Sequence, residues 1–258
     1  MKPTFVGALC LALLPAAVAP GLETITVRSG QSLGLPGAPG ALDDSVSYNP
    51  WGNPGGSPVL ATAFTPADFA ATTSGPSAVV ISPVSPWMGG AVAPLSDPLA
   101  RWINFRESFI GQTGAPGSAL YSVPFTIQSQ SFSQVLLCIE GGVDDTLGDS
   151  FSGDSPNLEG LYVNGIAVPS SLTTINLNFG TFNFAQASTH TVDITASVTP
   201  GLNHFYLLQR DVGFGVSGLI FSATIKVIPE PTCLTLVATL AVASCGRRPG
   251  RRLRLKAD

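Results

Sequence analysis

The chain has 258 residues, of which 45% are hydrophobic, with 28 glycines, 22 prolines and a formal net charge of −4. This apolar content is sufficient for a folded core and excludes a disordered low-complexity chain, while the glycines and prolines predict many turns. Residues 20–228 hold 5 basic and 14 acidic side chains, a formal charge of −9, which excludes nucleic-acid binding because that function needs basic patches.

The first 19 residues have the three parts of a secretory signal peptide. Lys2 supplies a positive start, residues 5–14 are apolar, and Ala17-Val18-Ala19 is a small-x-small cleavage site. Pro20 follows this site directly, so we expect cleavage within a residue or two of Ala17 and Ala19. The chain is therefore predicted to be exported through the Sec translocon and cut by signal peptidase.

Residues 20–228 are predicted to form a single domain, since their length suits one sizeable core and no linker-like charge run divides them. Cys138 is the only one of the 4 cysteines in this range, which excludes a disulfide within the mature body. Between Leu137 and Ile139, Cys138 is expected to be a small buried hydrophobe.

The first half of this domain is rich in loops. Residues 25–28 and 79–82 are predicted strands, and Pro66 is expected to open one short helix over 66–71. Glycine and proline indicate loops at 34–40 and 49–58.

The second half alternates apolar and polar residues with a period of two, most strongly over 118–227. The expected strands are 121–127, 134–140, 158–164, 175–179, 192–198, 202–209 and 219–227. Turns are predicted at Asn164-Gly165, at Pro200-Gly201 and within 213–218. Many short strands separated by turns predict an all-β fold, an antiparallel β-sandwich.

Short motifs in this half resemble the galactose-binding type of jelly-roll domain. They are Asp144-Asp145, Leu161-Tyr162-Val163-Asn164-Gly165 and Gly201-Leu202-Asn203. The resemblance covers residues 118–227 and implies a jelly-roll-like sandwich. Several such domains bind sugars and others only present a scaffold, so the fold does not settle the function.

An acidic stretch carries the candidate metal ligands Asp144, Asp145, Asp149 and Asp154, set among glycine and serine residues. Calcium takes about six to eight oxygen ligands, and a flexible loop with several carboxylates supplies them. A structural calcium ion is therefore one interpretation of the stretch, and a solvated acidic loop is the alternative. No other cofactor is expected.

Aromatic rings in the first half are the candidate ligand-binding residues. An exposed tryptophan stacks on a sugar face, which points to Trp87 and Trp102, although core packing is the alternative for both. His190 and His204 are expected in loops or at strand ends. No nucleophile motif or metal-type spacing accompanies them, so no catalytic residue is assigned.

The chain ends in three distinct segments. Pro229-Glu230-Pro231 cannot continue a helix, residues 232–244 are apolar, and 6 of the 12 Lys and Arg residues follow. The basic residues are Arg247, Arg248, Arg251, Arg252, Arg254 and Lys256. A helix of about 13 residues spans about 20 Å, less than the roughly 30 Å bilayer core. We expect a short transmembrane segment with its basic tail, 247–258, in the cytoplasm.

This tail, residues 229–258, resembles the PEP-CTERM sorting signal of bacteria that secrete extracellular polysaccharide. The resemblance implies transient insertion in the inner membrane and processing by an exosortase-type enzyme that recognises Pro229, Glu230 and Pro231. An ordinary tail anchor is the alternative.

The expected function is that of an exported, non-enzymatic protein of the cell surface or extracellular matrix, associated with exopolysaccharide. A carbohydrate-binding, lectin-like module is the alternative. A secreted glycoside hydrolase is a third hypothesis, because paired carboxylates serve as acid and nucleophile in such enzymes.

Overall fold

The computed structural model describes residues 21–51, 62–84, 95–106, 118–144, 146–148, 159–168, 187–211 and 217–230. The predictions for the signal peptide, for a strand at 175–179 and for the tail beyond Glu230 lie outside these residues. One compact unit extends from Leu22 to Pro229.

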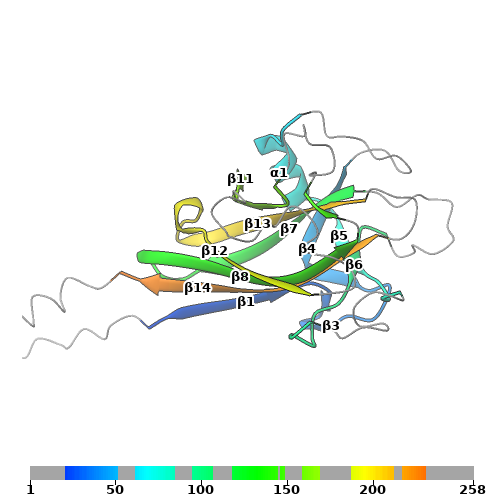
Figure 1. The fold of residues 1–258 in the computed structure, drawn as a ribbon, viewed down its shortest axis with the longest axis horizontal. Helices are drawn as coiled ribbons and strands as arrows, with labels where there is room; N and C mark the ends of the chain where they lie inside the picture. The colour runs from blue at the N-terminus through cyan, green and yellow to red at the C-terminus, as the bar shows by residue number, and fades with distance from the viewer. Residues whose placement is uncertain are drawn as a thin grey trace, which may run out of the picture. The chain divides into compact units, whose positions relative to one another are not determined.

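The described residues are mostly β-strands in a curled antiparallel sheet, as Figure 1 shows. The longer strands are β1 (Glu23–Arg28), β4 (Leu42–Trp51), β7 (Ser118–Ile127), β8 (Phe132–Asp144), β12 (Ser188–Asp193), β13 (Gly201–Arg210) and β14 (Gly218–Pro229). The shorter ones are β2 (Gln31–Ser32), β3 (Leu35–Pro36), β5 (Ser77–Val80), β6 (Ile103–Asn104), β9 (Thr146–Leu147), β10 (Leu161–Val163) and β11 (Ile166–Ala167). The helix α1 (Pro66–Thr73) confirms the predicted short helix.

The strand order is β11-β10-β13-β7-β4-β5-β6-β14-β8-β12, with β1 beside β14 and β9 beside β13. The prediction of an antiparallel β fold is thus confirmed. The two layers of this fold belong to one continuous sheet, because β6 pairs with both β5 and β14. The sheet curls until its two halves face each other.

The main apolar core lies between those two halves. The rings of Phe205 on β13 and Phe221 on β14 meet there, with centroids 5.7 Å apart. On β8 the side chains of Val135, Leu137 and Ile139 face this core and are at most 1% exposed. Because a shift of one residue would turn these side chains to solvent, the core fixes the strand register.

Cys138 lies on the opposite side of β8 from Leu137 and Ile139 and is half-buried. Cys138 is therefore less buried than the sequence predicted, because the period of two that buries its neighbours turns it to the other face of the strand.

The strand predicted at 192–198 overlaps the observed strand only at residues 192 and 193, because β12 runs from Ser188 to Asp193 and a 3₁₀ turn follows at Thr195–Ser197. The Asp193 carboxylate accepts the Thr195 backbone N–H at 2.9 Å, and the Val135 backbone N–H donates to the Thr195 hydroxyl at 2.8 Å. Such side-chain hydrogen bonds compete with the strand ladder and turn the chain.

The predicted loop at 49–58 is wrong at its start, since residues 49–51 pair with β7. The buried carboxylate of Asp43 stabilises the start of this strand. It accepts the backbone N–H groups of Gly30, Ser45 and Val46 at 2.5, 2.9 and 2.9 Å. Asp and Pro are rare in strands, which is why the sequence pattern concealed β4.

The first and last strands are neighbours, with Glu23 opposite Val227 and Arg28 opposite Ser222. Burial raises the pKa of Glu23, but hydrogen bonds from Gln128 and Ser129 outweigh it and lower the pKa. The Glu23 carboxylate thus joins β1 to the loop after β7. β14 ends at Pro229, the first residue of the Pro-Glu-Pro motif.

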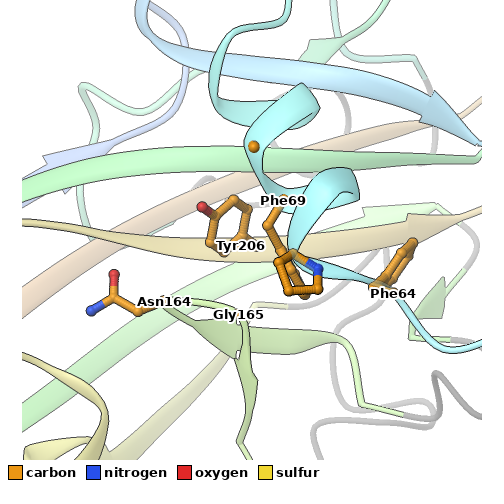
Figure 2. A pocket seen from close by; sticks show the side chains of 7 residues that line it. Phe64, Phe69, Asn164, Gly165 and Tyr206 are labelled. Atoms are coloured by element: carbon orange, nitrogen blue, oxygen red, sulfur yellow. The ribbon is translucent and has the colours of Figure 1, made fainter.

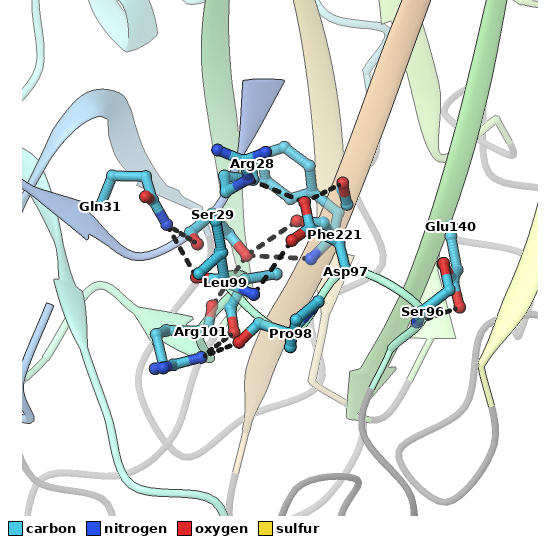
Figure 3. A network of polar contacts seen from close by, with 12 residues as sticks. Arg28, Ser29, Gln31, Ser96, Asp97, Pro98, Leu99, Arg101, Glu140 and Phe221 are labelled. Carbon is cyan, nitrogen blue, oxygen red and sulfur yellow. Dashed lines mark hydrogen bonds and ion pairs between the residues drawn. The ribbon is translucent and has the colours of Figure 1, made fainter. Parts of the chain in front are cut away.

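The segment 95–102, directly before β6, crosses β1, β14 and β8 and is held by the polar contacts in Figure 3. The Asp97 carboxylate pairs with Arg28 Nε at 2.7 Å and accepts the Ser222 hydroxyl at 2.8 Å. The backbone N–H of Ser96 donates to Glu140 at 2.9 Å. The same segment contributes to a second apolar cluster, which is formed by Ile81, Leu95, Ala100, Trp102 and Ile220.

Candidate functional site

A surface pocket of about 380 Å³ lies between α1 and the β10–β11 hairpin. Its lining residues are Phe64, Pro66, Phe69, Ala70, Asn164, Gly165 and Tyr206. Figure 2 shows Phe64 and Asn164 at opposite ends of the pocket, with Phe69 and Tyr206 between them. This volume falls in the range of about 300–1,000 Å³ that is usual for small-molecule sites.

The helix α1 forms one wall and begins at a capping box. The Thr65 hydroxyl accepts the Asp68 backbone N–H at 3.4 Å, and the Asp68 carboxylate accepts the Thr65 backbone N–H at 2.7 Å. Pro66 occupies the first turn, where its missing N–H costs nothing. After the helix, Gly75 approaches Tyr48 so closely that an added Cβ would lie 2.0 Å from the Tyr48 carbonyl oxygen. The helix is therefore fixed against β4.

The floor of the pocket is a cluster of aromatic rings. Phe69 and Tyr206 meet edge to face, with centroids 4.8 Å apart, and Phe64 lies 5.8 Å from Phe69. The ring of Tyr162 packs against both phenylalanines, with its centroid 5.4 Å from that of Phe69 and 5.6 Å from that of Phe64. Each ring is held by its neighbours, so the pocket is already shaped before a ligand arrives.

The opposite wall is the turn between β10 and β11. Asn164 and Gly165 have φ angles of 50° and 81°, which are left-handed values that an Asn-Gly turn adopts easily. The turn predicted at these residues is confirmed. An added Cβ on Gly165 would lie 3.2 Å from the Phe69 ring, so the absence of a side chain lets the hairpin approach α1.

The two polar side chains of the lining are already hydrogen-bonded within the protein. Asn164 Nδ2 donates to the Ser197 carbonyl and to Asn203 Oδ1, both at 2.8 Å, and Asn164 Oδ1 accepts the His204 backbone N–H at 2.9 Å. The Tyr206 hydroxyl lies 3.0 Å from the Thr73 hydroxyl. The pocket therefore presents mainly carbon to a ligand.

Both histidines lie inside strands, which corrects the prediction of loop or strand-end positions. Burial lowers the pKa of His190, on β12, and of His204, on β13, and so favours their neutral forms. His204 Nδ1 lies 3.0 Å from the hydroxyl of Ser122, but Ser122 is fully buried. This serine–histidine contact joins β13 to β7.

Of the predicted ligand-binding tryptophans, Trp87 lies outside the described residues. Trp102 is only 2% exposed and packs in the second apolar cluster. Its ring is not available for stacking on a sugar, so that assignment is corrected.

Of the predicted calcium ligands, Asp144 is 5% exposed at the end of β8, and Asp145, Asp149 and Asp154 lie outside the described residues. Within the described ranges, no three His, Cys, Asp or Glu side chains gather closely enough to hold a metal ion. The calcium site stays a prediction.

Of the predicted processing residues, Pro229 ends β14 and Glu230 follows it, whereas Ala17, Ala19, Pro231 and the arginines lie outside the described residues. In the described part of the chain, no helix is long and apolar enough to cross a membrane.

The aromatic pocket was not predicted from the sequence, because its walls are separated by about a hundred residues. A local signal did exist. Phe64 precedes Thr65-Pro66-Ala67-Asp68, a helix start of the capping-box type, and Phe69 follows on the first turn. Two rings flanking a capped helix start indicate that the helix makes a hydrophobic contact there. They do not indicate which residues of other elements join that contact.

No protein family matches the sequence in a comparison with known families, and no curated protein matches it. Among solved structures, the chain is similar to the native structure of a family 35 carbohydrate binding module from Clostridium thermocellum. The two share 10% identity and a TM-score of 0.29, over 57% of this chain and 86% of that chain. An identity and a TM-score this low carry no argument about ligand or activity.

Proposed function

We propose that the chain is an exported, non-catalytic protein of the cell surface or extracellular matrix, with a jelly-roll-like body that is released from a C-terminal sorting tail. The observation that carries this proposal is the end of β14 at Pro229, where the Pro-Glu-Pro motif begins. Every strand that the structure describes ends at or before Pro229, so removal of the chain beyond the motif leaves these strands intact.

The position of β14 explains why such processing is compatible with a stable body. β14 pairs with β1 on one side and with β8 on the other, so its hydrogen bonds and core contacts are complete before the tail begins. The exposed Ile228 and the half-buried Pro229 then lead directly into Glu230. The partners implied are an exosortase-type enzyme and the exopolysaccharide layer.

The test is maturation of a Glu230→Ala variant in the native host. We expect the precursor to accumulate in the inner membrane, because the motif that the enzyme recognises is lost. Glu159→Ala, which removes a carboxylate from the body, is the control and should mature normally. Normal maturation of Glu230→Ala, measured by membrane fractionation and mass spectrometry of the C-terminus, would count against the sorting function.

A second candidate function is carbohydrate binding, and the aromatic pocket favours it. Pro66 and Ala70 are exposed at its rim, Phe64 is half-buried, and sugars present apolar C–H faces that stack on such surfaces. In this proposal the secreted body adheres to polysaccharide through the pocket.

The test is co-sedimentation of the mature protein with exopolysaccharide from the native host. Phe64→Ala should weaken retention by about tenfold, because it removes one end of the pocket. Phe132→Ala removes a partly buried ring that packs against the main core and serves as the control. Equal retention of the two variants and of the unaltered protein would argue against the pocket as the binding site.

A further inference from the structure

We infer that the aromatic pocket selects sugars that carry a methyl group in place of a hydroxyl, in particular 6-deoxyhexoses over the corresponding hexoses. This inference rests on the carbohydrate-binding function proposed above and names its ligand class.

The first reason is the state of the polar groups in the lining. Both N–H bonds of the Asn164 amide are donated to Ser197 and Asn203, and the Tyr206 hydroxyl is paired with Thr73. At the helix start, the capping box already uses the backbone N–H groups of Thr65 and Asp68. The Asn164 amide therefore has no N–H left for a sugar oxygen, and the Tyr206 hydroxyl already has a hydroxyl partner within the protein.

The second reason is the carbon surface that remains. Phe64, Pro66, Phe69 and Ala70 line the α1 side of the pocket, and none of their side chains has a polar atom. A sugar hydroxyl placed against them loses its hydrogen bonds to water and gains none from the protein. A methyl group in the same place gains van der Waals contact with these side chains and gives up no hydrogen bond to water. The site therefore favours the deoxy sugar over the sugar that carries the hydroxyl.

The third reason is rigidity. The rings pack edge to face, the hairpin turn is fixed by left-handed residues, and the Asn164 amide is held at three points. Rearranging the lining to offer a new hydrogen-bond donor would therefore cost free energy. Asn164 Oδ1 keeps a second lone pair, which accepts one ring hydroxyl at the end of the pocket and orients the sugar.

The experiment compares two sugars that differ at one carbon. The mature protein is titrated calorimetrically with the methyl glycosides of D-galactose and of 6-deoxy-D-galactose. We expect the deoxy sugar to bind about tenfold more tightly, as is usual when one unpaired buried hydroxyl is removed. Ala70→Leu fills the pocket without removing a helix contact and should weaken binding of the deoxy sugar by about tenfold or more.

Ala67→Leu is the matched control, since Ala67 is exposed on the same helix and does not line the pocket. Equal binding of the two sugars, lost in Ala70→Leu, would overturn the deoxy preference and leave the carbohydrate-binding function standing. Sugar binding that Ala70→Leu does not alter would overturn the assignment to this pocket. If neither sugar binds while the protein still co-sediments with exopolysaccharide, the deoxy-sugar inference fails and the carbohydrate-binding function stands; if co-sedimentation is also lost, both fail.

Discussion

Asn203 is fully buried, and its side-chain amide makes four hydrogen bonds. Its Oδ1 accepts the Thr199 backbone N–H at 3.0 Å and the Asn164 amide at 2.8 Å, and its Nδ2 donates to the carbonyls of Thr199 at 2.7 Å and Gly201 at 2.9 Å. Two motifs that the sequence singled out separately, Asn164-Gly165 and Gly201-Leu202-Asn203, therefore meet in space. Their residue types were readable from the sequence, but their contact depends on strand pairing.

Asn203→Asp should destabilise the body by about 3 kcal/mol, because a carboxylate oxygen would face two carbonyl oxygens in a buried site. Asn49→Asp adds the same charge at a half-buried position on β4 and should cost about 0.5 kcal/mol. Urea denaturation of the two variants gives the comparison. Similar stabilities would contradict the structural role of the Asn203 amide.

The two histidines predict how stability depends on pH. Burial lowers the pKa of His190 and of His204 below the ordinary value of 6.5, so the unfolded chain binds protons more readily than the folded one. The free energy of unfolding should therefore fall as the pH drops from about 7.5 to about 5.5. A double variant, His190→Gln with His204→Gln, should show a flatter dependence. An equally steep dependence in that variant would rule out the histidines as its cause.

At the level of elements, the sequence predicted the strands and the helix whose formation depends on the local pattern of residues. Strands β7, β8, β13 and β14 alternate apolar and polar residues, and α1 begins with Thr65 and Pro66, so both kinds of element were readable. β4 was hidden because Asp43 and Pro50 are unfavourable in strands, and its stabilising hydrogen bonds come from tertiary neighbours such as Gly30. The strand at β12 was placed too far along the chain because the turn after Asp193 depends on a side-chain contact.

Thr65→Ala should destabilise α1 by about 1 kcal/mol, because the capping box loses its hydroxyl acceptor. Thr65→Ser keeps that hydroxyl and should retain most of the stability. Thermal denaturation measures both. The stability of α1 also matters for the pocket, since α1 carries Pro66, Phe69 and Ala70. A Thr65→Ala variant as stable as the unaltered protein would show that tertiary packing alone fixes the helix.

At the scale of the whole molecule, the curled sheet brings together segments that the sequence keeps apart. The pocket combines residues 64–70 with Asn164-Gly165 and Tyr206, and strand order alone decides that these neighbour one another. No local pattern encodes that order, which is why the tryptophans were favoured as ligand contacts and the phenylalanines were overlooked. The pairing of β1 with β14 likewise places the first and last strands of the body side by side.

We propose above all that the body is exported and then separated from its basic C-terminal tail. The most direct measurement is the intact mass of the mature protein recovered from the surface or medium of its native host. We predict a mass that lacks both the first 19 or so residues and the segment after Pro229-Glu230-Pro231. A mass that includes Arg247 to Arg254 would contradict it.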